Sequence, residues 1–150
     1  DAYNKRLANY DTVIMGRRTY EFGYNFGLKP GMRPYPHMRH LIFSKSILLP
    51  EDAEVESVSD NWLSRIDAVK AETGTDIYLC GGGKLAGYLL AHGRIDRLII
   101  KLAPVVIGSG IPLFANLNHP FKFEAIQVER YKNDVTLLEY QVNSAGGHAS

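Results

Sequence analysis

The sequence predicts a mixed α/β fold, with a mostly parallel sheet, helices on both faces and a C-terminal antiparallel hairpin. Two observations support this prediction. Over the first two thirds of the chain, short apolar segments alternate with segments of helical periodicity, as in parallel strands joined by helices. After residue 120, two runs of alternating apolar and polar residues are separated by Lys132-Asn133-Asp134, which is typical of a hairpin.

The individual elements follow from the spacing of the apolar residues. Between the helix expected at 17–22 and the strand expected at 41–43, residues 23–38 contain three glycines and three prolines and predict a long loop, which is more often functional than idle. We expect helices up to residue 9, at 17–22, at 61–72 and after 84, and strands at 12–15, 41–43, 55–58, 77–80, 95–107, 121–131 and 135–142.

Length and composition indicate one domain with a substantial core. The chain has 150 residues, of which 45% are hydrophobic, and it contains no repeat or internal linker. We expect the domain to cover residues 1–143, followed by a flexible tail at 144–150 that is small, polar and without periodicity. The chain opens on Asp1 rather than methionine and has helical spacing at once, so we expect further sequence upstream.

The charge balance and the few metal-binding residue types exclude several classes of function. Seventeen basic residues against sixteen acidic ones predict neither a nucleic-acid surface nor a membrane surface, so any anion site must be local. No apolar run approaches ~20 residues, and Cys80 in an apolar strand is typical of a small buried side chain in a reducing compartment. We therefore expect a cytoplasmic protein. The histidines are scattered or lie in loops, so no metal site is predicted.

The most informative feature is a glycine turn between a strand and a helix. The apolar strand 77–80 is followed by Gly81-Gly82-Gly83, then by Lys84 and a helical pattern that starts at Leu85. Glycines at such a junction let the backbone approach a ligand, and the helix that follows offers free N–H groups to a phosphate. The turn favours a nucleotide cofactor, although three glycines also suit a tight turn without a ligand.

Two other stretches have the same character. Residues 16–19, Gly-Arg-Arg-Thr, and residues 44–46, Ser-Lys-Ser, each follow a predicted strand and bring cations and hydroxyl groups. If the strands are parallel, all three stretches lie along one edge of the sheet, where open α/β sheets bind ligands. Together they have the donors for a pyrophosphate and one further phosphate. Taken singly, each stretch also fits an ordinary solvated loop.

Two common nucleotide motifs do not fit. Gly81, Gly83 and Ala86 satisfy the dinucleotide pattern G-x-G-x-x-A, but the ribose-binding acid expected about 20 residues later is absent, since residues 102–105 are Leu-Ala-Pro-Val. A phosphate-binding P-loop is excluded because Leu85 stands where a magnesium-binding Ser or Thr is required. No G-x-S-x-G segment is present, so hydrolase chemistry has little support.

At this level of detail the chain resembles a known family. Over residues 11–142 it is similar to the dihydrofolate reductase-like fold and, within it, to the reductase domain of the bifunctional riboflavin-pathway deaminase/reductase, the RibD C-terminal domain, in its stand-alone bacterial form. The segments that carry the resemblance are residues 11–21, 43–46, 80–85, 95–97 and 104–114.

The resemblance implies an NADPH site and explains the missing acid, because a carboxylate would repel the 2′-phosphate of NADP. In this family the first of the three stretches contacts the phosphates of the cofactor, the second lies near its 2′-phosphate, and the third lies on the pyrophosphate and nicotinamide side. The residues so implied are Gly16, Arg17, Arg18 and Thr19, then Ser44 and Lys45, then Gly81, Gly82, Gly83, Lys84 and Leu85.

The implied activity is reduction of a small heterocycle in riboflavin biosynthesis or a related pathway. The resemblance predicts NADPH-dependent hydride transfer to a C=N or C=O group of a pterin or a ribosylaminopyrimidine, and no catalytic side chain is identified. Gly108, Gly110 and Phe114 are weak candidates for substrate contacts, since this stretch also fits a packed strand end. The alternatives are an NADP-binding module without turnover and a structural protein whose glycines serve packing only.

The resemblance has two further implications. Members of this family begin with an apolar strand and a loop that lie in the middle of the sheet and line the substrate pocket, and neither precedes Asp1 in this sequence. The family also suggests a homodimer. The aliphatic run 98–107 is a candidate interface, although it equally fits a strand of the core.

Overall fold

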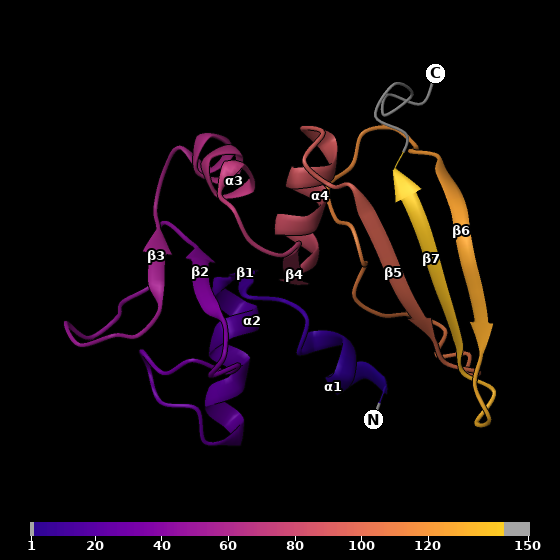
Figure 1. The fold of residues 1–150 in the computed structure, drawn as a ribbon, viewed down its shortest axis with the longest axis horizontal. Coiled ribbons are helices and arrows are strands. Elements are labelled where there is room, and N and C mark those ends of the chain that lie inside the picture. The colour runs from indigo at the N-terminus through magenta and orange to yellow at the C-terminus, as the bar shows by residue number, and fades with distance from the viewer. Residues whose placement is uncertain (1, 143–150) are drawn as a thin grey trace.

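The computed structural model describes residues 2–142, so the tail predicted at 144–150 lies outside the described residues. These residues form two sheets with helices packed around them (Figure 1). The elements are α1 (Ala2–Leu7), β1 (Thr12–Gly16), α2 (Arg17–Phe22), the 3-10 helix η1 (Gly23–Phe26), β2 (Arg39–Phe43), β3 (Glu56–Val58), α3 (Trp62–Ala71), β4 (Ile77–Gly81), α4 (Gly83–Ala91), β5 (Arg97–Leu102), β6 (Phe123–Arg130) and β7 (Thr136–Val142).

The first sheet contains four parallel strands in the order β3-β2-β1-β4. In the register of the strands, Gly16 of β1 lies opposite Phe43 of β2, and Met15 lies opposite Gly81 of β4. The carboxyl ends of β1, β2 and β4 therefore lie together at one edge of this sheet. This confirms the mixed α/β class predicted from the sequence.

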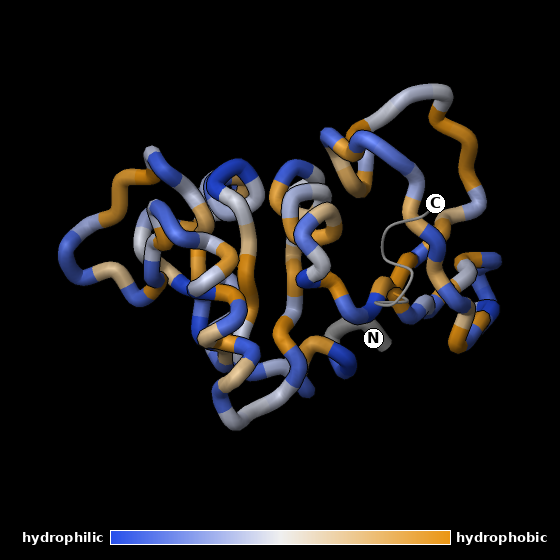
Figure 2. The backbone as a smooth tube through the Cα atoms, turned by 90° about the horizontal axis from the view of Figure 1, so that it is seen from above, coloured by the Kyte–Doolittle hydropathy of each residue, from blue (hydrophilic) through white to orange (hydrophobic). Residues whose placement is uncertain are grey.

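The parallel sheet is covered on both faces, as predicted. On one face, Ile14 of β1 packs in a buried cluster with Ile66 of α3 and Leu89 of α4. On the other face, Met15 belongs to a second cluster that includes Tyr20 of α2 and Leu7 of α1. Alternate side chains of a strand point to opposite faces, so β1 contributes to both clusters. Figure 2 shows the matching hydrophobic stretches along the central strands.

The second sheet contains the predicted hairpin. Its order is β5-β7-β6 with antiparallel pairing throughout, and the turn is closed by a hydrogen bond of 2.8 Å from the Tyr131 amide to the Val135 carbonyl. The strand predicted at 95–107 is too long, because β5 ends at Leu102. Pro104 follows and has no N–H to donate to a neighbouring strand. Residues 103–113 instead form an exposed loop.

The parallel strands and the antiparallel strands do not join into one continuous sheet. Strand β4 pairs with β1 only, and β5 pairs with β7 only, so β4 and β5 are not hydrogen-bonded to each other. The parallel and antiparallel sheets stand side by side (Figure 1). Residues of both sheets line a cavity of about 860 Å³. Sequence patterns identify strands, but they do not show which edges meet.

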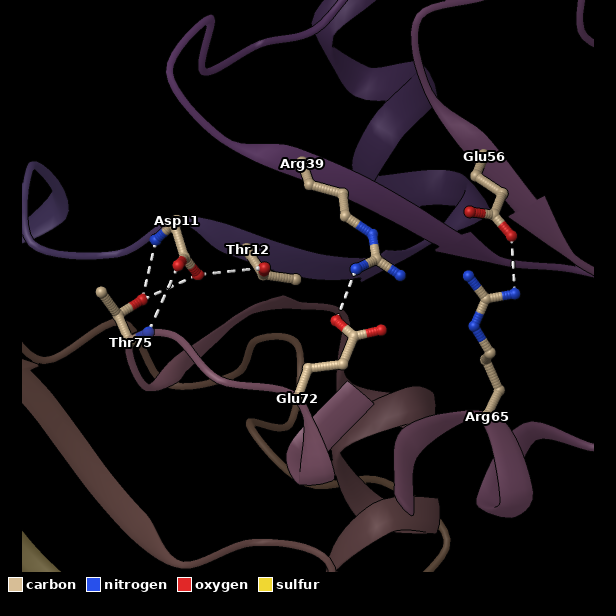
Figure 3. Close-up of polar contacts among 7 residues, drawn as sticks. All are labelled: Asp11, Thr12, Arg39, Glu56, Arg65, Glu72 and Thr75. Carbon is tan, nitrogen blue, oxygen red and sulfur yellow. Dashed lines mark hydrogen bonds and ion pairs between the residues drawn. The ribbon is translucent and has the colours of Figure 1, made fainter. Parts of the chain in front are cut away.

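Polar contacts join the amino ends of the strands, opposite to the edge described above (Figure 3). Thr75, just before β4, donates from its hydroxyl to the Asp11 carboxylate at 2.9 Å, and the Asp11 amide donates back to that hydroxyl at 2.8 Å. These hydrogen bonds hold the pKa of Asp11 below its usual value. Arg39 of β2 forms an ion pair of 2.7 Å with Glu72 after α3. A second ion pair, Arg65–Glu56, links α3 to β3.

Segment 112–115 lies directly on α4. The Ala115 amide donates to the Gly83 carbonyl at 2.9 Å. A Cβ atom at Gly83 would collide with the Pro112 carbonyl oxygen, and one at Gly87 would collide with the Ala115 carbonyl oxygen. Both glycines are therefore required by the close approach of this segment, although glycine is unfavourable inside a helix.

The buried His40 holds the start of β2 against the long loop. Its Nδ1 lies 3.0 Å from the Met38 carbonyl oxygen and must donate, while its Nε2 accepts from the Tyr35 amide at 3.3 Å. The ring is therefore the neutral Nδ1–H tautomer, since a second ring proton would face the Tyr35 N–H. Burial lowers the pKa of His40 to about 4.

Among residues 2–142, no helix is long and apolar enough to span a bilayer.

We predict that this histidine makes stability depend on pH. The unfolded state takes up a proton below the ordinary pKa of 6.5, whereas folded His40 stays neutral until about pH 4. The free energy of unfolding should therefore decrease by up to about 3 kcal/mol as the pH falls from 6.5 to 4. Urea titrations across this range measure it. His40→Gln should flatten the dependence, and exposed His119→Gln should not; equal slopes in both variants contradict the assignment.

We also predict that Gly87→Ala destabilises the protein. In most helices this substitution stabilises by about 0.5–1 kcal/mol, because alanine restricts the unfolded chain. Here the new methyl group would press on the Ala115 carbonyl, so we expect a loss of about 1–3 kcal/mol in urea denaturation. A stabilised variant would show that segment 112–115 does not lie on α4.

Candidate functional site

The three stretches singled out in the sequence lie along one edge of the parallel sheet. Each follows a strand: residues 17–19 follow β1, residues 44–46 follow β2, and residues 82–84 follow β4. The strands are parallel, and apart from an irregularity in the β1–β4 pairing, where Met15 lies opposite Gly81, their carboxyl ends are aligned, so they meet where open α/β sheets place ligands. The structure thus brings the predicted residues together. Their contacts with a cofactor stay a prediction.

The glycine turn packs directly beside α2. Gly81 has φ +138°, a conformation that side-chain-bearing residues rarely adopt, and it is joined to Gly82 by a cis peptide bond. A Cβ atom added to Gly82 would lie 3.2 Å from the Thr19 hydroxyl oxygen. Gly16 is also close, with its Cβ position 3.7 Å from the Gly82 nitrogen. The Thr19 hydroxyl and the backbone of the turn therefore lie close together.

Helix α4 offers its N-terminus at this edge. Its N-cap residue is Gly82, which makes no side-chain capping hydrogen bond, and its first turn contains no acidic residue. The first N–H groups of a helix have no partner within the helix, so here they are left for water or for an anion. Lys84 is exposed in the same turn and Leu85 is buried beneath it.

The cationic side chains of the site are mostly exposed. Arg18 and Lys45 are exposed, and Arg17 is half-buried with its Nε 3.7 Å from a carboxylate oxygen of Glu21 on the next turn of α2. Ser44 has a more structural position than predicted. It is buried, and its hydroxyl oxygen accepts hydrogen bonds from the Ser46 and Ile47 amides at 3.1 and 3.0 Å. Ser44 therefore shapes the loop that presents Lys45.

The 860 Å³ cavity between the sheets reaches this edge. Thr19 and the glycine turn line its end, together with Phe114, one of the three predicted substrate residues. Gly108 and Gly110 are not among the lining residues and lie in the exposed loop 103–113. All three substrate contacts stay predictions.

Sequence analysis did not identify two aromatic residues of the cavity. Tyr10 and Tyr78 line it, and their rings stack with centroids 5.6 Å apart. They lie before β1 and within β4, two segments that only the folded sheet brings together, so no local signal connects them.

Among residues 2–142, no three His, Cys, Asp or Glu side chains are grouped so that they could hold a metal ion.

Solved structures with the same fold include three reductase-type or riboflavin-related proteins. A protein described as a candidate riboflavin biosynthesis protein from Shewanella sp. PV-4 has a TM-score of 0.79 and 22% identity, over 95% of this chain and 79% of that one. Dihydrofolate reductase from Enterococcus faecalis, solved in complex with NADP(H), has a TM-score of 0.66 and 14% identity, over 95% and 81% of the two chains.

The third is the diaminohydroxyphosphoribosylaminopyrimidine deaminase/5-amino-6-(5-phosphoribosylamino)uracil reductase from Thermotoga maritima, with a TM-score of 0.64 and 17% identity. The match covers 94% of this chain and 48% of that longer one. At these identities the likeness establishes the fold, which is the dihydrofolate reductase-like fold expected from the sequence. The family model for the RibD C-terminal domain matches residues 1–137, and the chain therefore belongs to the RibD C-terminal domain family.

Proposed function

We propose that the protein is an NADPH-dependent reductase that transfers hydride to a C=N or C=O group of a pterin or a ribosylaminopyrimidine. One observation carries the proposal. The aligned ends of β1, β2 and β4 gather glycines, cations and hydroxyl groups at one edge, and this edge opens into a cavity of about 860 Å³. That volume is within the range of small-molecule sites.

The residues present fit a phosphorylated dinucleotide. The N-terminus of α4 lacks a side-chain cap and an acidic residue in its first turn, which suits the pyrophosphate. Arg17 and Arg18 supply guanidinium groups from α2, and Lys45 is presented by the loop after β2. A cation at that position suits the 2′-phosphate of NADPH, whereas dinucleotide sites that prefer NADH place a carboxylate on the ribose.

The NADPH, when bound, supplies the hydride, so this chain needs to orient the ring and the substrate rather than provide a nucleophile. In this proposal Thr19 contacts the phosphates, the Gly81–Gly83 turn lies on the pyrophosphate and nicotinamide side, and Phe114 faces the substrate. The family and the reductases that share the fold support the substrate class. No catalytic acid is assigned.

Titration with NADPH and NADH tests the proposal, with the fluorescence of the bound nicotinamide as the signal. Selective NADPH binding is expected, followed by its oxidation when pterins or ribosylaminopyrimidines are added. Binding without oxidation of NADPH by either substrate class would favour the non-catalytic NADP-binding module. Binding of neither dinucleotide would overturn both functions and leave the glycines a packing role only.

We predict that Lys45→Ala weakens NADPH binding more than NADH binding. Loss of a charge-assisted contact to the 2′-phosphate should cost about 1.5–3 kcal/mol, or roughly 10- to 150-fold in Kd. Arg17→Ala should have an effect of the same size, measured in the same titration.

The control is Lys132→Ala. Lys132 is an exposed lysine in the turn between β6 and β7, in the antiparallel sheet and away from the strand ends of the parallel sheet. It should leave both affinities unchanged. If Lys45→Ala weakens both dinucleotides equally, Lys45 does not contact the 2′-phosphate.

We further propose that two copies of the chain pair through the loop 103–113. Val106 is 100% exposed and Ile111 94% exposed, and Val105 and Ile107 beside them are also exposed. Contiguous apolar patches of this kind are typical of interaction sites. Val106→Asp should convert a dimer to a monomer in light scattering, while Val128→Asp on β6 should not. A wild-type monomer at high concentration contradicts the proposal.

A further inference from the structure

Helix α2 and the 3-10 helix η1 form one continuous helical segment that contains two pairs of aromatic side chains. The backbone stays in the right-handed helical region at Phe22 and Gly23, where one helix passes into the other, and it leaves this region at Gly27, which has φ +91°. Aromatic residues occupy positions 20, 22, 24 and 26. Residues four apart lie on the same side of a helix, so these aromatic residues form two separate pairs.

The inner pair, Tyr20 and Tyr24, holds the segment in place. Tyr20 is 1% exposed, and its ring lies edge-on to that of Tyr24 with the centroids 5.7 Å apart. The Tyr20 hydroxyl donates to the Met32 carbonyl at 2.7 Å and accepts from the Gly31 amide at 2.9 Å. This pair therefore fixes the segment on the parallel sheet and ties it to the long loop that follows.

The outer pair, Phe22 and Phe26, is exposed. Phe22 is 63% and Phe26 75% exposed, and their rings lie against each other with the centroids 5.3 Å apart and the planes inclined by 57°. Single exposed apolar residues are common on protein surfaces, but core packing does not explain two phenyl rings held together in solvent. Phenylalanine is also a weaker helix former than the charged residues usual at exposed positions. The outer pair therefore has the character of a binding surface.

The outer pair lies one helical turn from the candidate cofactor edge. Helix α2 begins at this edge with Arg17, and the hydroxyl of Thr19 lies close to the Gly82 backbone at the end of the cavity. Residues at positions i, i+3 and i+7 share a helix face, so Thr19, Phe22 and Phe26 follow one another along the segment. At 1.5 Å per residue, Phe22 is about 5 Å and Phe26 roughly 10 Å further along the axis than Thr19.

The direction of the side chains brings the outer pair toward the same edge. Long side chains in a helix lean toward its N-terminus, which directs the Phe22 ring over the turn that contains Arg18 and Thr19. Neither phenylalanine of the pair lines the cavity itself. The two rings therefore continue the candidate site outside the cavity, from Thr19 outward along the helix. A substrate ring that lies on them would be next to the proposed cofactor.

We propose that Phe22 and Phe26 form a stacking platform for the fused bicyclic ring of a pterin. The proposal rests on the proposed reductase function and chooses between its two substrate classes. Because the phenyl planes are inclined by 57°, a ligand ring that lies flat on one phenyl ring meets the other with its edge. Stacked and edge-to-face contacts are the arrangements that aromatic rings prefer.

The bicyclic ring fits this platform better than a ribosylaminopyrimidine does. A fused ring covers more of the two phenyl rings than a single pyrimidine ring, so it removes more apolar surface from water. A ribosylaminopyrimidine also carries a hydrated ribosyl group, which gains nothing from contact with phenyl surface. The platform would therefore act on the choice of substrate and leave the binding of NADPH unaffected.

Pterin binding tests the platform directly. The full-length protein is titrated into pterin without any dinucleotide, and the anisotropy of the pterin fluorescence reports binding. Phe22→Leu keeps an apolar side chain but removes the ring, so the Kd of pterin should rise about 3- to 10-fold, and Phe26→Leu should act in the same direction. Phe22→Tyr keeps the ring and should leave the Kd within about twofold of wild type. Unchanged affinity in the leucine variants, or no binding of pterin to the wild type, overturns the proposal.

A matched probe and a matched variant serve as controls. Diaminopyrimidinone has the hydrogen-bonding edge of pterin but only one ring, so Phe22→Leu should weaken its binding, measured by competition with pterin, less than that of pterin itself. Equal losses for the two probes contradict the assignment to a bicyclic ring. Val128→Ala removes exposed apolar surface from β6 and should leave both Kd values unchanged. Because Phe22 is exposed, Phe22→Leu should melt within about 2 °C of wild type.

Failure of the platform and failure of the reductase give different results. The Kd of NADPH, measured by nicotinamide fluorescence, should be the same in the wild type and in Phe22→Leu. Binding of NADPH together with unchanged pterin affinity in the leucine variants overturns the platform alone. Absence of NADPH binding overturns the reductase, while the pterin titration, which contains no dinucleotide, still decides on the platform. If Phe22→Leu dissociates a dimer in light scattering and leaves the Kd of pterin unchanged, the pair lies between two copies and the platform is overturned.

Discussion

The site depends on one constraint, the parallel pairing of β1 with β2 and β4, which aligns their carboxyl ends. Each strand end places a different chemical group: cations and a hydroxyl after Gly16, a shaped loop after Phe43, and glycine backbone after Gly81. These groups lie far apart along the chain, and only the sheet brings them together. A shift of one residue in the register would turn the side chains of a strand to the opposite face, so the two buried clusters that fix the register also fix the site.

The polar groups that stabilise the fold and the polar groups proposed to bind a ligand lie at opposite edges of the parallel sheet. At the amino ends of the strands, polar groups satisfy one another, as in the Asp11–Thr75 hydrogen bonds and the Arg39–Glu72 ion pair. At the carboxyl ends, Lys45, Arg18 and Lys84 are exposed, and α4 begins without a side-chain cap. Donors that have no role in holding the chain together are the ones available to an anion. This distribution of donors supports a ligand at the carboxyl edge, independently of any likeness to other proteins.

Local sequence patterns predicted most helices and strands. They did not predict features that depend on contacts between segments distant in the sequence. The apolar run 77–80 and the glycines after it specified β4, its turn and α4, because turn chemistry and periodicity are local properties. The strand expected at 95–107 was too long, since apolar residues in an exposed loop look like those of a strand. Ser44 was predicted as a phosphate contact, but its bonds to the loop amides depend on the folded turn. The division into two sheets has no local signal at all.

Strand β4 links the cavity to the proposed cofactor site. Its residues line the cavity between the sheets, and the same strand ends at Gly81, where the turn to α4 begins. The turn is held from one side by Thr19 and from the other by segment 112–115, which rests on Gly83. In the proposed function, this packing on two sides preorganises the backbone on the pyrophosphate and nicotinamide side, which raises affinity because less motion is lost on binding.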